Sequence, residues 1–153
     1  MTTSQAPSPT IRNAGTTPAK SRKLFVNLPV SDLQRSIDFF ETLGFTFNTQ
    51  FTDATATCML VGEDAYFMLI TPEKFRDFSK RPIPDARKET GVLLAVSADS
   101  RAEVDQLVEK ALAAGGSPAT DAQDLGFMYL RTFHDLDGHH WEVFWMDPAA
   151  VQG

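Results

Sequence analysis

Residues 134–145, HDLDGHHWEVFW, carry the kinds of side chain that catalytic metal sites use. The stretch holds all three histidines of the chain, together with three acids and two tryptophans. Imidazole and carboxylate groups are the usual protein ligands of zinc and of other catalytic metals. The same residue types also occur in a turn followed by a strand, where their roles are structural. The stretch is therefore either a metal site or an ordinary strand.

The alternation of side chains along a strand divides the end of this stretch into two faces. One face carries His140, Glu142 and Phe144, and the other carries His139, Trp141, Val143 and Trp145. If Glu142 points into a cleft, His140 does too, and the tryptophans then pack toward a helix layer. Two potential ligands are one short of a typical catalytic set. A displaced site in which Asn27 adds a third donor stays open as an alternative.

The other polar residues of the stretch have simpler explanations. Asp135 and Asp137 precede a glycine, and aspartates often shape turns by bonding nearby backbone. We interpret His134 as an exposed residue at a strand end and His139 as a surface residue of the turn. The one cysteine, Cys58, lies in the apolar run TATCMLV, which favours a buried thiol over a nucleophile.

The elements that must position these residues occur twice in the same order. In the first half, a strand at residues 23–30 precedes SDLQ, where Ser31 and Gln34 have capping-box spacing. A helix then runs to Gly44. Strand candidates follow at residues 45–51, 55–61 and 65–71.

The second half repeats this order. A strand at residues 91–98 precedes a capping box at Ser100 and Glu103, and a helix then runs to Gly115. Strand candidates follow at residues 117–123, 126–133 and 139–145. Each half is therefore a βαβββ unit, with one face of its sheet covered by its helix and the other face uncovered.

Two such modules, at about residues 23–71 and 91–147, form one α+β domain over residues 23–148 if they pair around a cleft. The charged segment between them, residues 72–90, contains three prolines and reads as a linker or lid with one helical turn. Residues 1–22 are rich in Ser, Thr and Pro and are typical of a disordered tail.

The repeated order and two local motifs resemble the vicinal oxygen chelate superfamily, which includes glyoxalase I, bleomycin-resistance proteins and extradiol dioxygenases. The motifs are NLPVSDLQRSIDFFETLGF in the first module and DLDGHHWEVFW in the second. The resemblance covers about residues 23–147. It implies the glyoxalase/bleomycin-resistance/dioxygenase-like fold, with two βαβββ modules around a cleft and commonly a homodimer.

The resemblance also implies four positions for metal ligands, and this chain keeps one of them. The matching positions hold Phe25, Met68, a residue near Leu93, and Glu142. Phenylalanine and leucine have no lone pair to donate, and a thioether is a poor ligand for hard divalent metals. We therefore expect no metal and no other cofactor.

Without a metal, Glu142 needs a partner or an upward shift of its pKa, because burying a carboxylate is costly. His140 on the same face and Arg131 on a neighbouring strand are the candidate partners. An ion pair without any chemistry is the alternative to a role in binding. The expected cleft is otherwise apolar, with Phe25, Asn27, Tyr66, Met68 and Leu93 along its walls and Tyr129 as a further candidate.

Composition narrows the function. The net charge is −6, which argues against nucleic acid and anionic membranes as partners. No segment has the length and apolarity of a membrane span, so we expect a cytoplasmic protein. The first hypothesis is a metal-independent homodimer that binds a small, partly aromatic molecule. The second is a metal-dependent enzyme that resembles lactoylglutathione lyase or a dioxygenase, and the third is an interaction module.

Overall fold

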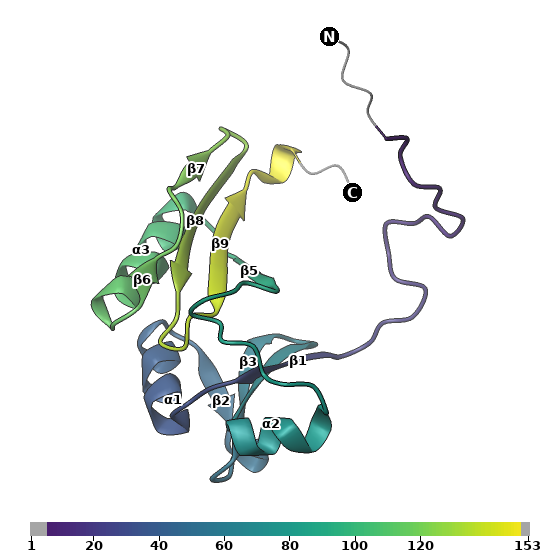
Figure 1. Cartoon of the computed structure of the whole chain (residues 1–153). Helices are drawn as coiled ribbons and strands as arrows, with labels where there is room; N and C mark the ends of the chain where they lie inside the picture. The colour runs from purple at the N-terminus through teal and green to yellow at the C-terminus, as the bar shows by residue number, and fades with distance from the viewer. Residues whose placement is uncertain (1–5, 151–153) are drawn as a thin grey trace.

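The structure is a computed structural model that describes residues 6–150. Residues 6–22 contain no helix or strand and are exposed. Figure 1 shows this segment running away from the folded part of the chain. The first five residues of the expected tail lie outside the described residues.

The first module forms a four-stranded sheet in the order β1-β4-β3-β2. β1 and β4 are parallel, and the other pairs are antiparallel. Its elements are β1 (Leu24–Pro29), α1 (Leu33–Thr42), β2 (Thr46–Asn48), a 3-10 turn (Thr49–Phe51), β3 (Ala56–Gly62) and β4 (Ala65–Ile70).

The second module repeats this arrangement with a sheet in the order β5-β9-β8-β6, and β7 also pairs with β8. Its elements are β5 (Leu93–Ser97), α3 (Arg101–Ala113), β6 (Ser117–Pro118), β7 (Gln123–Asp124), β8 (Met128–His134) and β9 (His140–Met146). A further helix, α2 (Pro72–Phe78), lies between the modules, and a 3-10 turn (Pro148–Ala150) follows β9. None of the described helices is long and apolar enough to cross a membrane.

The expected α+β class and the repeated order are confirmed, but three local predictions need correction. The N-cap of α1 is Asp32, whose side chain accepts from the Arg35 N–H, so the capping box at Ser31 and Gln34 is wrong. The strand at residues 45–51 ends early in a 3-10 turn, and the strand at 117–123 is two short strands. The linker contains seven helical residues rather than a single turn.

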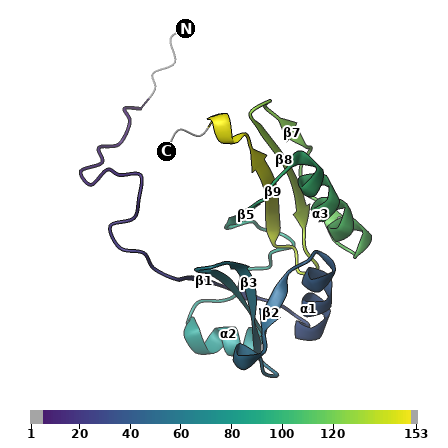
Figure 2. The same cartoon turned by 180° about the vertical axis from the view of Figure 1, so that it is seen from behind.

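The helices α1 and α3 cover the same side of the two sheets, which we call the inner face (Figures 1 and 2). Side chains that point to the inner face form one continuous core from both modules. Trp141 lies at its centre, with ring centroids 5.2 Å from Phe40 and 4.8 Å from Phe67. The prediction that the tryptophans of β9 face the helix layer is therefore confirmed for this residue. We call the opposite side of the sheets the outer face.

Polar contacts also join the modules. The backbone N–H and the hydroxyl of Ser31 donate to Asp137 Oδ1 over 2.9 and 2.7 Å. The Nε2 atom of His139 lies 2.8 Å from the carbonyl oxygen of Pro29. The turn between β8 and β9 therefore holds the end of β1, and Ser31 contributes to this junction instead of capping α1.

Candidate functional site

The outer face of the second sheet carries the polar pair that the alternation predicts. His140 and Glu142 point outward from β9, level with Leu93 and Ala95 of β5. The Nε2 atom of His140 lies 3.9 Å from Glu142 Oε1, which is too long for a hydrogen bond. The side chains of His140 and Glu142 are 10% and 26% exposed.

The outer face of the first sheet carries the expected aromatic and amide groups. Phe25 pairs in register with Tyr66, and their rings stack at 4.6 Å between centroids. Asn27 pairs with Met68 in the same way. Phe25 is 49% exposed, so this aromatic surface is open.

Arg131 does not belong to this site, and the expectation that it partners Glu142 is wrong. Arg131 lies opposite Val143 in the ladder, so it shares the inner face. Its guanidinium binds Asp105 and Glu109 of α3, at 3.1 and 2.8 Å. A shift of one residue along β8 would move Arg131 to the other face of the sheet. The alternation within β8 does not reveal its register with β9, and this register determines the face.

Tyr129 also lies on the inner face rather than in the cleft. Its hydroxyl donates to Asp105 Oδ1 over 2.6 Å. This hydrogen bond is the main cause that lowers the pKa of Asp105, and it also raises the pKa of Tyr129. Both pKa shifts arise from a contact that packs α3 on its sheet, so they indicate a structural role.

The remaining histidines are less exposed than expected. His134 is half-buried, and its ring meets that of His140 edge-on with 5.4 Å between centroids. His139 is half-buried at the module junction through its contact with Pro29. Neither is the free surface residue that its place in the sequence indicates.

Asp135 has a larger role than turn formation alone. Its side chain is buried and accepts from the N–H groups of Asp137 and His139 and from the Trp141 indole. Burial raises the pKa of this carboxyl group. The neighbouring His139 and these hydrogen bonds act in the opposite direction and limit the rise. No pattern in the sequence marks an aspartate that enters the core beside Trp141.

The most telling group of the site is the Nε2 atom of His140. This nitrogen is buried and has no hydrogen-bond partner among the described residues. A buried polar atom without a partner loses its hydration without compensation. A hydrogen bond to this imidazole, from a bound ligand or from Glu142 after a small movement, would therefore be stabilising.

Two hollows lie between the modules. One, of about 180 Å³, lies between Asn27 and His140, with Phe75 of α2 on its wall. Residues 84–92, which we call the strap, close this hollow from the linker side. The other, of about 350 Å³, lies between Tyr66 and Phe144 and falls within the size range of small-molecule sites.

The residues at these positions do not fit a divalent metal. The side chains matched to three of the ligand positions, Phe25, Met68 and Leu93, offer no hard donor, and Ala95, level with Glu142, offers none either. Within residues 6–150 there is no group of three or more His, Cys, Asp or Glu side chains placed to hold a metal ion. The chemistry that His140 and Glu142 can offer is therefore hydrogen bonding and charge.

Cys58 is buried, as its apolar surroundings predict. Burial raises the pKa of its thiol, so the reactive thiolate is disfavoured. This residue therefore supplies packing rather than a nucleophile.

Comparison with known proteins finds a sequence match to the first module and similar folds over most of the chain. Residues 22–62 match the model of the bleomycin resistance protein-like N-terminal family. No curated protein sequence matches the chain.

Three solved structures illustrate the shared fold. The hypothetical protein SA1046 from S. aureus is 29% identical, with 83% of this chain and 95% of that chain covered and a TM-score of 0.70. A glyoxalase/bleomycin resistance protein/dioxygenase family enzyme from Burkholderia phytofirmans is 17% identical, with coverage of 80% and 96% and a TM-score of 0.66. The fosfomycin resistance protein FosX from Listeria monocytogenes is 17% identical, with coverage of 82% and 93% and a TM-score of 0.59.

The two modules, the match of the first module and these shared folds agree with one another. The chain therefore has the glyoxalase/bleomycin-resistance/dioxygenase fold, and its resemblance to the vicinal oxygen chelate superfamily is confirmed.

Proposed function

We propose that the protein binds a small, partly apolar organic molecule on its outer face, without a metal. The observation that carries this proposal is the buried Nε2 of His140, which lacks a partner among the described residues and lies beside Glu142 and next to an apolar hollow. Apolar clefts with a few convergent polar groups suit small organic ligands.

The polar groups specify the chemistry of the ligand. An ionised carboxylate only accepts hydrogen bonds, so Glu142 calls for an N–H or O–H donor. The stacked rings of Phe25 and Tyr66 offer an aromatic surface across the module junction. An arylalkylamine satisfies both requirements, because its ammonium group binds Glu142 while its ring lies on apolar surface.

We include a homodimer in the proposal. Several large apolar side chains near the junction are exposed, and they include Leu24, Phe25, Val92 and Leu93. Exposed apolar side chains that gather in one region are typical of an interface or a ligand-binding groove. A second copy that covers part of this surface would also enclose the two hollows between the modules more fully. Light scattering tests this arrangement, and a monomer of about 17 kDa at micromolar concentration would contradict it.

The binding test uses tryptamine and benzylamine as probes, with benzoate as the oppositely charged comparison. We expect the amines to bind in titrations followed by NMR, and benzoate to bind more weakly. Glu142→Gln should weaken amine binding roughly tenfold, because it removes a charge-assisted hydrogen bond. Glu109→Gln removes the same charge from the far side of the sheet and should leave binding unchanged. Equal binding by both variants would contradict the role of Glu142.

Elemental analysis separates this proposal from the alternative of a metal-dependent lyase or dioxygenase. After dialysis and separate additions of Ni²⁺, Zn²⁺ and Mn²⁺, we expect no stoichiometric metal. One equivalent of metal that disappears in Glu142→Ala would overturn the proposal in favour of the alternative.

A further inference from the structure

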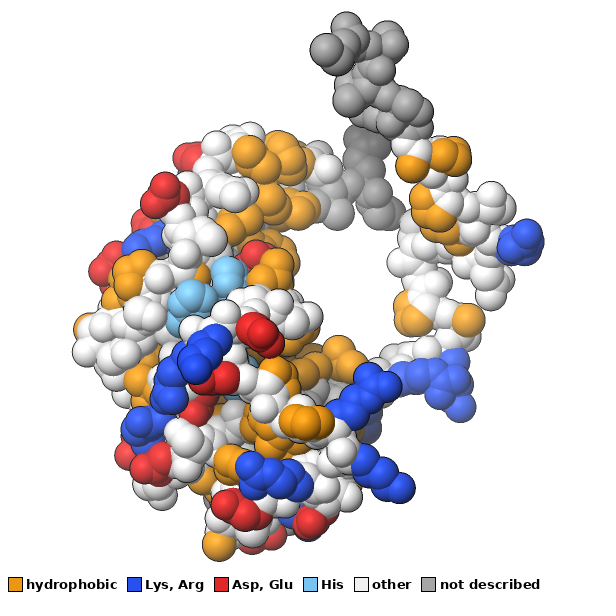
Figure 3. All heavy atoms as spheres, viewed as in Figure 1, with side chains coloured by type: hydrophobic (Ala, Val, Ile, Leu, Met, Phe, Trp, Pro, Cys, Tyr) orange, Lys and Arg blue, Asp and Glu red, His pale blue; other side chains and the backbone are white. Residues whose placement is uncertain are grey.

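A separate hollow of about 390 Å³ lies on the other side of the strap. Its walls come from α1, from the strap, from the chain that leaves α3 and from the end of β8. The side chains that matter here are Arg35, Arg87, Ser117, His134 and Asp135. Figure 3 shows the histidines beside a group of Lys and Arg side chains on this side of the molecule.

The Arg87 guanidinium forms no ion pair with an acid among residues 6–150, and the nearby Asp85 binds its backbone N–H instead. None of the ion pairs in this part of the chain involves Arg87. Its Nη2 donates instead to the carbonyl oxygen of Leu136 over 3.1 Å. A carbonyl orients the guanidinium but leaves its formal charge and its other N–H donors available.

The acids nearest this hollow are engaged elsewhere. Asp135 is buried and directs its carboxylate to the turn and to Trp141. Asp137 accepts two hydrogen bonds from Ser31 and lies 3.8 Å from the Arg35 guanidinium. Asp137 therefore partly neutralises the positive charge of Arg35, and the remaining positive charge of the hollow is mainly that of Arg87.

The position of Arg87 is fixed by the chain around it. Its backbone N–H donates to Asp85 Oδ1 over 3.0 Å. Behind it, the strap approaches Gly138 so closely that an added Cβ would lie 2.8 Å from backbone atoms of Ala86 and Arg87. The backbone of Arg87 is thus held in place, and the hydrogen bond to the Leu136 carbonyl orients its exposed guanidinium.

We propose that this hollow is a second binding site, which takes a small molecule with a phosphate or carboxylate group. The oxyanion binds the free N–H donors of Arg87, with Arg35, His134 and the Ser117 hydroxyl around it. Guanidinium groups match the geometry of both oxyanions. The hollow is distinct from the amine-binding face, because neither His140 nor Glu142 lines it, and the His134 ring is where the two sites touch.

Titration with inorganic phosphate, followed by amide NMR, tests the site directly. We expect saturable shifts at Gly115, Ser117 and Leu136, and sodium chloride of equal ionic strength should not produce them. Acetate and phenyl phosphate distinguish a carboxylate from a phosphate ester as the preferred group. Saturation by either class at these amides supports the site.

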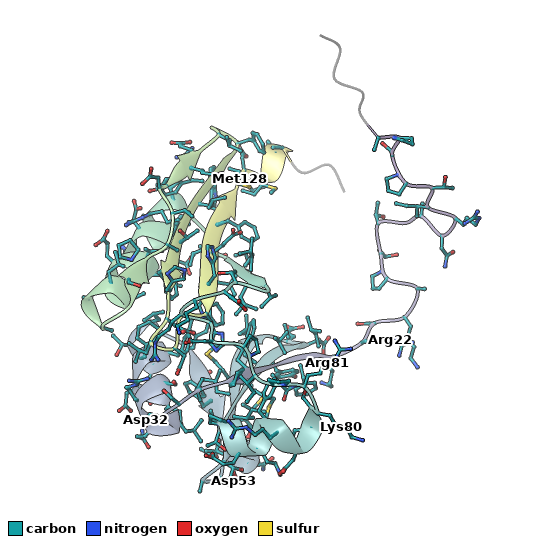
Figure 4. All side chains as sticks on the ribbon, in the orientation of Figure 1. Arg22, Asp32, Asp53, Lys80, Arg81 and Met128 are labelled. Atoms are coloured by element: carbon teal, nitrogen blue, oxygen red, sulfur yellow. The ribbon has the colours of Figure 1, made fainter. Side chains whose placement is uncertain are left out.

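Matched variants of the same segment decide the role of Arg87. Arg87→Gln should weaken phosphate binding roughly ten- to a hundredfold, as expected for the loss of a charged hydrogen bond. Arg81→Gln makes the same change of charge at an exposed linker residue, labelled in Figure 4, and should stay within about twofold. Equal binding by the two folded variants, or shifts that chloride reproduces, would overturn the proposal.

Discussion

The two faces of β9 differ although their residues alternate along one strand. On the inner face, the indole N–H of Trp141 donates to Asp135, and the side chain of Val143 is fully buried. On the outer face, His140 Nε2 has no partner among the described residues, and Glu142 remains partly exposed. The chain itself supplies the partner of the Trp141 indole on the inner face, whereas it leaves His140 Nε2 on the outer face without a partner among the described residues. Stability and binding should therefore separate along this strand.

The largest expected loss of stability comes from Asp135→Ala on the inner face. The change leaves three donors without their acceptor, one of them the Trp141 indole. We expect the free energy of unfolding in urea to fall by about 3–5 kcal/mol. Asp121→Ala, at an exposed position of the same module, should cost less than about 0.5 kcal/mol. A similar small cost for both would remove the distinction between the faces.

A smaller loss is expected for Gly138→Ala, at the turn that leads into β9. Gly138 and Gly44 both have positive φ angles, of 93° and 102°. In each, alanine should cost about 1–2 kcal/mol for a left-handed backbone. An added Cβ at Gly138 also meets the strap, while one at Gly44 meets nothing within 4 Å. Thermal unfolding should place Gly138→Ala about 1–3 kcal/mol below Gly44→Ala, and equal costs would show that the strap moves freely.

Glu142→Gln should leave stability within about 1 kcal/mol of the original protein. The contact of Glu142 with His140 is too long for a hydrogen bond, and the side chain reaches solvent. Urea unfolding without ligand measures this effect. A loss as large as that of Asp135→Ala would mean that the outer face is also a structural unit.

The smallest effect is expected for removal of residues 1–22, whose described part belongs to neither face. The described part of this segment, residues 6–22, is exposed throughout. We expect the Tm to change by less than about 2 °C. A larger drop would show that the segment packs on the outer face.

The sequence predicted what depends on local periodicity and failed where distant segments meet. The repeated order of elements and the faces of His140, Glu142 and Trp141 follow from alternation within one strand. The prediction for Arg131 was wrong because the face it occupies depends on the register between β8 and β9. The sequence of one strand does not reveal that register.

The same limit explains the residues whose roles were missed. Ser31 bonds Asp137, and Arg87 bonds the Leu136 carbonyl, across long stretches of sequence. No periodicity within either segment marks such a contact. The hollow beside Arg87 could therefore be found only from the folded chain.

The parallel pairing of β1 with β4, and of β5 with β9, constrains the order in which the chain can fold. The hairpins β3–β4 and β8–β9 join strands that are neighbours in sequence and close after short loops. β1 and β5 instead pair with the last strand of their own module, β4 and β9, which lies far along the chain. Contacts between distant parts of a chain form slowly, because a large loop must first be closed. Phe25, Asn27 and Leu93 lie on β1 and β5, so we expect the outer face to be completed after the hairpins that support it.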